Sequence, residues 1–93
     1  MRIIWTPAAA QDRADIWDYL YELNPVAAID MDNRFRDAVS RIARYPETGP
    51  LGIITGTREL IPHQSYRLVY QPESDATWIL ALVHTSRQWP PSS

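Results

Sequence analysis

Apolar positions recur at helical spacing in two successive segments of the first half of the chain. The first segment begins at Thr6 and Pro7, where a threonine able to cap free amides precedes a proline suited to the first helical position. Asn24 and Pro25 repeat this arrangement, so we expect one helix to end there and another to begin at once. The expected inward positions are Ala9, Arg13, Ile16, Leu20 and Leu23, then Met31, Phe35, Ala38 and Ile42. Such a short connection predicts an antiparallel helical hairpin.

Four shorter apolar runs predict strands on either side of this hairpin. They cover residues 2–5, 57–61, 66–70 and 77–85, with turn residues between the last three. The run at 77–85 is apolar at nearly every position, which is typical of an interior strand. The order β-α-α-β-β-β predicts one α+β domain over residues 1–93, in which a helical hairpin packs on a small antiparallel sheet. The last three strands are expected to form a meander.

Alternation along the strands divides their side chains between two faces. Tyr66, Leu68 and Tyr70 should face one way and Arg67 the other. Two interpretations of Arg67 stay open, an exposed residue paired with Glu59 on the next strand or a functional cation. In the last strand the expected shared face consists of Trp78, Leu80, Leu82 and His84. His84 thus ends an apolar row, where a hydrogen-bonded structural histidine is the favoured interpretation over an acid–base catalyst.

Charged residues on the helices are interpreted mainly as a solvated surface. Arg13 occupies an inward position, and we expect its stem to lie on the core with its head in water. The alternative is an inward arginine that supports a site. On the second helix three acid–base pairs at i,i+4 spacing are expected on the outer face. These pairs are Asp30 with Arg34, Asp32 with Arg36, and Asp37 with Arg41.

Composition narrows the chemistry that the chain can perform. The 93 residues include no cysteine and two histidines, so neither a disulfide nor a thiolate metal site can form, and no metal or cofactor is expected. All nine basic residues are arginine, which removes lysine nucleophiles and bases from consideration. The formal net charge of -2 disfavours a protein that binds nucleic acid by neutralising many phosphates. No apolar run reaches the ~18–20 residues of a membrane span, and a cytoplasmic location is expected.

Four segments in order resemble the RelE/ParE superfamily, the toxins of type II toxin–antitoxin systems. They are "WTPAAAQDRADIWDYL", "RYPETGP", "GTRELIPHQSYRLVY" and "LVHTSRQWP". The resemblance implies a cognate antitoxin that wraps and neutralises this chain, and contact with operator DNA through that antitoxin only. It also implies one of two targets. ParE-like members poison DNA gyrase, whereas RelE-like members cut mRNA, often on the ribosome.

The second half of the chain favours the ParE-like group. A metal-independent RelE-like nuclease needs a base, an acid and cations around one phosphate, and Arg58, Arg67 and His84 are the candidates for these roles. However, no tyrosine follows Tyr70, so the C-terminal tyrosine of the cutting members has no counterpart here. We therefore expect a gyrase-binding toxin that is not an enzyme. The alternatives are a RelE-like mRNA interferase and a non-toxic chain that serves only as an antitoxin-bound corepressor.

The C-terminal tail carries the expected partner-binding residues. Arg87 and Trp89 follow the last strand on a segment rich in serine, glutamine and proline. Arginine and tryptophan are enriched at binding hot spots, so Arg87 and Trp89, together with Arg67, are predicted to contact a partner. A second interpretation has Trp89 folding back over the helices to cover the core.

Overall fold

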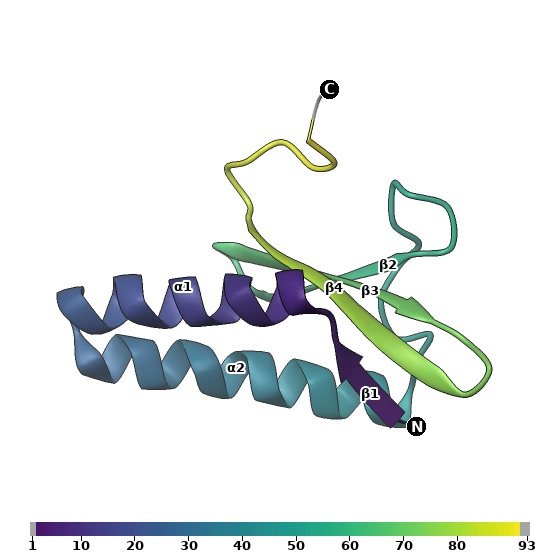
Figure 1. Cartoon of the computed structure of the whole chain (residues 1–93), viewed down its shortest axis with the longest axis horizontal. Coiled ribbons are helices and arrows are strands. Elements are labelled where there is room, and N and C mark those ends of the chain that lie inside the picture. The colour runs from purple at the N-terminus through teal and green to yellow at the C-terminus, as the bar shows by residue number, and fades with distance from the viewer. Residues whose placement is uncertain (1, 92–93) are drawn as a thin grey trace.

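A helical hairpin lies across one face of a four-stranded sheet (Figure 1). The computed structural model describes residues 2–91. Along the chain the elements are β1 (Arg2–Trp5), α1 (Pro7–Leu23), α2 (Pro25–Arg44), β2 (Arg58–His63), β3 (Tyr66–Pro72) and β4 (Ala76–His84). The predicted order β-α-α-β-β-β and the α+β class are confirmed.

Both helices begin where the capping residues predicted. The Oγ1 of Thr6 accepts a hydrogen bond from the N–H of Ala9 at 3.1 Å, and Pro7 is the first residue of α1. The Oδ1 of Asn24 accepts from the N–H of Val26 at 3.0 Å. These bonds satisfy amides that lack a partner in the first turn of a helix. Neither helix is long and apolar enough to cross a membrane, within the part of the chain that the structure describes.

The sheet has the order β1-β4-β3-β2, and one of its pairings differs from the prediction. The expected sheet was antiparallel, whereas β1 runs parallel to β4, with Arg2 beside Ala76 and Trp5 beside Ile79. The cause is the hairpin, which returns the chain to the beginning of β1 (Figure 1). From there β2 runs in the same direction as β1, and after two reversals β4 does too. The predicted interior position of the last strand is confirmed.

A β-bulge in β4 overturns part of the predicted alternation. Val69 of β3 pairs with Ala81, but the next residue, Tyr70, pairs with Ile79, so Leu80 is left without a partner on β3. An extra residue of this kind shifts the following side chains to the other face. Ile79 and Leu82 are three residues apart and yet both belong to the core. The predicted shared face of Trp78, Leu80, Leu82 and His84 is therefore wrong on the N-terminal side of the bulge.

The core lies between the hairpin and the sheet. Its buried members are Ala9, Phe35, Ala38, Ile42, Tyr66, Leu68, Tyr70, Ile79 and Leu82. The inward positions of α2 and of β3 are thus confirmed. Leu23, which was expected to face inward, is 67% exposed. The reason is visible in Figure 1, where the hairpin extends beyond the sheet and its end has no strand opposite.

Arg13 and Asp32 also depart from the prediction, because they bind each other. The Nε of Arg13 lies 2.7 Å from Oδ1 of Asp32, and Nη2 lies 2.9 Å from Oδ2. Arg36 approaches Asp32 only to 4.0 Å. Asp32 is therefore not an outer-face acid paired mainly within its own helix. It forms a bidentate ion pair between the two helices, and Arg13 does not place its head freely in water.

Candidate functional site

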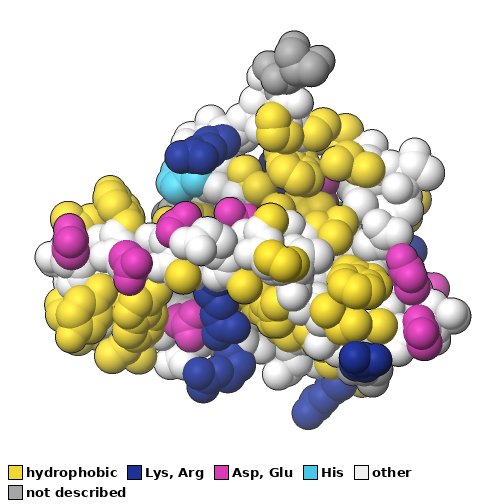
Figure 2. Space-filling view, viewed as in Figure 1, with side chains coloured by type: hydrophobic (Ala, Val, Ile, Leu, Met, Phe, Trp, Pro, Cys, Tyr) yellow, Lys and Arg dark blue, Asp and Glu magenta, His cyan; other side chains and the backbone are white. Residues whose placement is uncertain are grey.

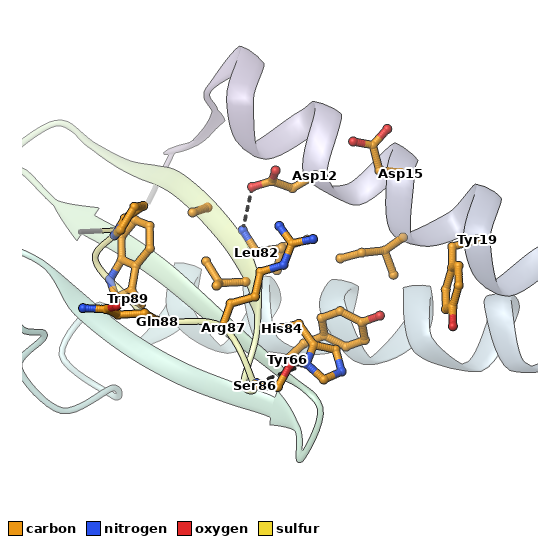
Figure 3. A pocket seen from close by; sticks show the side chains of 14 residues that line it. Asp12, Asp15, Tyr19, Tyr66, Leu82, His84, Ser86, Arg87, Gln88 and Trp89 are labelled. Carbon is orange, nitrogen blue, oxygen red and sulfur yellow. Dashed lines mark hydrogen bonds between the residues drawn. The ribbon is translucent and has the colours of Figure 1, made fainter. Parts of the chain in front are cut away.

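A cavity of about 710 Å³ opens between α1, the end of β4 and the C-terminal tail (Figure 3). Asp12, Asp15 and Tyr19 line it from α1. The opposite wall is formed by tail residues 86–89. The cavity therefore collects the tail residues predicted to bind a partner and adds acidic and aromatic residues from the first helix.

The free edge of β4 lies beside this cavity. Because β1 ends at Trp5, β4 has no neighbouring strand on that side after Ile79. Side chains from the start of α1 replace the missing strand. The Oγ1 of Thr6 donates to the carbonyl of Ile79 at 2.9 Å, and Oδ2 of Asp12 accepts from the N–H of Leu82 at 3.0 Å. The bond from Leu82 satisfies an amide that an open strand edge leaves unpaired, and the carbonyl of Ile79 accepts a second bond from the N–H of Thr6 at 3.1 Å.

Sequence reasoning did not single out Asp12, Asp15 or Tyr19 as site residues. Their spacing carried a signal, because residues three and four apart share one face of a helix. That face lies next to the inward-facing residues Ile16 and Leu20. It therefore lies beside the elements that pack on these two residues. The sequence did not reveal that β4 and the tail lie against this face.

Arg67 is held in an ion pair on the sheet face away from the helices. Its Nε lies 3.2 Å from Oε1 of Glu59, and both side chains are largely buried. The second carboxylate oxygen of Glu59 accepts from the N–H of Ile53 at 3.3 Å. The predicted pairing of Arg67 with Glu59 across the strands is therefore confirmed, although Arg67 is not exposed as expected, and its charge is already balanced within the chain.

Arg58 fixes the loop that follows α2. Its Nη1 donates to the carbonyl oxygen of Gly49 at 2.7 Å and to that of Glu47 at 3.3 Å. The hydroxyl of Tyr70 holds the same loop, since it donates to the carbonyl of Pro46 and accepts from the N–H of Gly49, both at 2.9 Å. Burial raises the pKa of Tyr70 above its ordinary value, so this phenol stays protonated at neutral pH. The contacts of Arg58 are structural.

His84 is exposed at the end of β4, beside the cavity. Its Nδ1 accepts a hydrogen bond from the N–H of Ser86 at 3.1 Å and lies 2.6 Å from the Ser86 hydroxyl. Its ring meets the ring of Tyr66 edge-on, with the ring centres 5.3 Å apart. Burial raises the pKa of Tyr66, so this tyrosine is also protonated at neutral pH. An Nδ1 that accepts from a backbone amide carries no proton, which leaves only Nε2 as a donor.

The three candidates for RNA cleavage do not meet. Arg58 pairs with Tyr70 and His84 with Tyr66, and side chains directly opposite on neighbouring strands share a face. Tyr66 and Tyr70 face the helices and are four residues apart, or about 13 Å along a strand. Arg67 lies on the other face. The sheet thus separates Arg58 from His84 along its length and places Arg67 on the face opposite both.

Arg87 and Trp89 are brought together at the cavity. The N–H of Arg87 donates to the carbonyl of His84 at 2.9 Å, which turns the tail back at the end of β4. Figure 3 shows the Arg87 side chain extending toward α1. Trp89 is partly buried in the lining of the cavity, and its indole N–H has no hydrogen-bond partner among residues 2–91. A buried donor without an acceptor costs about 1–3 kcal/mol.

Comparison with known families finds one match over nearly the whole chain. Residues 3–89 match the family described as the ParE toxin of type II toxin-antitoxin system, parDE. Toxin RelE2 of Caulobacter vibrioides is 33% identical over 86 residues, which cover 92% of this chain and 97% of that protein. The putative toxin Y4kP of Sinorhizobium fredii is 36% identical over 90 residues, covering 96% and 93% of the two chains.

Among solved structures, the fold is similar to the chromosomal ParDE toxin–antitoxin system of P. aeruginosa. The TM-score is 0.78, and the match covers 90% of this chain and 95% of that chain. The sequences are 20% identical over the match, so this likeness concerns the fold. The two helices and the four-stranded mixed sheet are common to both.

Proposed function

Because this chain belongs to the ParE toxin family and is the toxin of a type II toxin–antitoxin system, we propose that it arrests growth by binding DNA gyrase. It holds gyrase in a state in which the DNA is cleaved, and it does so through contact and not through chemistry of its own. A cognate antitoxin neutralises it by covering the contact surface. With a formal net charge of -2, the chain reaches operator DNA only through that antitoxin.

The separation of Arg58, Arg67 and His84 is the observation that supports an action by binding. Cleavage of RNA needs a base, an acid and a cation gathered around one phosphate. Here Arg58 holds a loop and Arg67 is paired with Glu59 on the opposite face of the sheet. His84 is hydrogen-bonded to Ser86 and has neither of these arginines beside it. Tyr66, the nearest phenol, has a raised pKa and is not a base at neutral pH.

The contact surface in this proposal is the rim of the cavity formed by the tail. Arg87 is exposed at this rim, and Trp89 is partly exposed beside the same cavity. Both residue types concentrate binding energy in protein interfaces. Arg67 is a weaker candidate than Arg87, because its guanidinium is already paired within the chain. Antitoxin and gyrase compete for this rim.

Gyrase assays with the purified, antitoxin-free chain test the proposal. Added to gyrase, ATP and plasmid, the toxin should inhibit supercoiling and leave linear DNA after the protein is denatured. Primer extension on cellular mRNA after induction serves as the opposing measurement. Codon-linked cuts in mRNA, with gyrase activity unaffected, would show that the target has been assigned wrongly.

A RelE-like endoribonuclease is the second candidate, and one observation favours it. The relative from Caulobacter vibrioides, 33% identical to this chain, carries the name toxin RelE2. Under this alternative His84 supplies the proton transfer through Nε2 while Arg58 and Arg67 supply positive charge. The double substitution of Arg67 and His84 by alanine should then abolish mRNA cleavage. Under the gyrase proposal the same variant, if folded, still traps cleaved DNA.

A further inference from the structure

The end of the helical hairpin carries an exposed group of large apolar side chains. We refer to it as the hairpin-end patch, and it consists of Tyr19, Tyr21, Leu23, Val26 and Ile29. Leu23 is 67% and Val26 64% exposed, at the last residue of α1 and near the first of α2. Figure 2 shows apolar side chains gathered at this end of the molecule, where the hairpin extends beyond the sheet. Clustered exposed apolar residues of this kind mark interaction sites.

The same end of the molecule is strongly acidic. Between residues 14 and 33 the chain has five acids and no arginine. One of these acids, Asp32, is neutralised by Arg13. The other four are exposed on the second half of α1 and the first half of α2, namely Asp15, Asp18, Glu22 and Asp30. In Figure 2 acidic side chains appear beside the apolar ones at this end, whereas the arginines lie elsewhere on the visible face.

The negative charge at this end of the molecule determines which kind of partner can bind the patch. A second copy of the chain would place one set of four carboxylates against another, and like charges brought together at an interface cost several kcal/mol. A segment with an apolar face flanked by arginine or lysine would instead bury the leucine, valine and isoleucine and pair with the acids. Electrostatic complementarity of this kind also speeds association.

We infer that the hairpin-end patch binds an amphipathic segment of the antitoxin that has an apolar face and basic flanks. This inference rests on the proposed function, in which an antitoxin neutralises the chain. The patch lies at the hairpin end, whereas the tail rim is formed where the tail meets α1 and the end of β4 (Figure 1). One antitoxin chain that spans both surfaces, which meet at Tyr19, therefore holds the toxin at two places, and Leu23, Val26 and Ile29 lie outside the lining of the cavity.

The test compares paired variants with matched controls on the full chain. Leu23→Ser with Val26→Ser removes apolar area from the patch, and Asp18→Arg with Glu22→Arg reverses its charge. The apolar control is Leu51→Ser with Ile53→Ser, since these side chains are equally exposed in the loop before β2. The charge control is Glu73→Arg with Asp75→Arg in the β3–β4 turn, where both acids are exposed. Circular dichroism and thermal unfolding confirm that each variant folds.

Affinity is measured by calorimetry against the purified cognate antitoxin. Both patch variants should bind at least about tenfold more weakly than wild type, which is about 1.4 kcal/mol. Both controls should bind like wild type. Raising the salt concentration should weaken wild type more than the charge-reversed variant, because the lost attraction is electrostatic.

The possible results separate this inference from the proposed function. If the antitoxin binds wild type and the patch variants with the same affinity, the inference is wrong and the proposed function stands. If the antitoxin does not bind wild type at all, the inference and the proposed neutralisation are both wrong, whereas the gyrase assays still decide the target. If free wild type is a dimer by sedimentation and Leu23→Ser with Val26→Ser makes it a monomer, the occupant is a second copy and the inference is overturned.

Discussion

The guanidinium of Arg13 lies between the carboxylate of Asp32 and the indole of Trp5. It makes a bidentate ion pair with the acid, and its central carbon is 4.9 Å from the centre of the ring. One side chain thus joins α1 to α2 and to β1. Planar guanidinium groups suit this combination of forked hydrogen bonds and stacking, which a lysine could not reproduce.

Replacing Arg13 by leucine should destabilise the protein by about 1–3 kcal/mol, because the partly buried Asp32 loses its charge-assisted hydrogen bonds. The measurement is urea unfolding followed by circular dichroism at neutral pH. Arg34→Ala, at an exposed position of α2, is the control and should change stability by less than about 0.5 kcal/mol. Equal stability of the two variants would mean that the ion pair contributes nothing.

Stability should fall on the acid side through the titration of Asp32. The hydrogen bonds from Arg13, more than any other contact, lower the pKa of this carboxyl below its ordinary value of 3.8. A lowered pKa in the folded state means that the unfolded state binds the proton more readily, so stability rises with pH. The contribution is fully present above about pH 4–5 and is lost as pH falls through the folded-state pKa. Unfolding between pH 2 and 6 should show a shallower acid-side loss in Asp32→Asn than in wild type, and a variant that keeps the full slope would refute the assignment.

Tyr70→Phe should loosen the loop between α2 and β2. The substitution removes both the donor to Pro46 and the acceptor for Gly49, and Gly49 is buried. An unsatisfied buried amide costs about 1–3 kcal/mol, and each kcal/mol lowers the melting temperature of a domain this size by about 4–8 °C. Thermal unfolding and hydrogen exchange of the Gly49 amide measure the effect. Tyr45→Phe, on an exposed tyrosine, should leave both unchanged.

Arg87→Ala should weaken the trapping of cleaved DNA by gyrase without affecting the fold. Its side chain is exposed at the rim of the cavity, so removing it should change stability by less than about 0.5 kcal/mol. The yield of linear plasmid at a fixed toxin concentration reports the contact, and Arg34→Ala again serves as the control. Undiminished DNA cleavage with Arg87→Ala would place the gyrase contact elsewhere on the molecule.

The sequence predicted those features that depend on neighbours along the chain. Thr6 with Pro7 and Asn24 with Pro25 mark the two helix starts correctly, since capping involves residues only two or three positions apart. The strands of the meander were found for the same reason, although β2 extends to His63 and β3 to Pro72, beyond the predicted ends. Helical periodicity likewise identified Phe35, Ala38 and Ile42 as core residues.

Features that depend on distant segments were not predictable in this way. The ion pair of Arg13 was not predicted, because its partner Asp32 lies 19 residues away. Local spacing on α2 instead assigned Asp32 to Arg36. The cavity combines α1 with a tail some 70 residues later, so Asp12 was not recognised as a residue that completes the edge of β4. The bulge at Leu80 reverses which face of the sheet the following side chains lie on. No glycine or proline in this strand indicated a bulge.

The parallel pairing of β1 with β4 has a consequence for folding during synthesis on the ribosome. Residues 2–5 pair in the sheet with residues 76–79. The first strand to be synthesised therefore cannot pair until β4, the last strand, has been made. Contacts of such long sequence separation slow folding, because the intervening chain must be ordered before they form. The growing polypeptide therefore cannot complete its sheet until residues 76–79 have been synthesised.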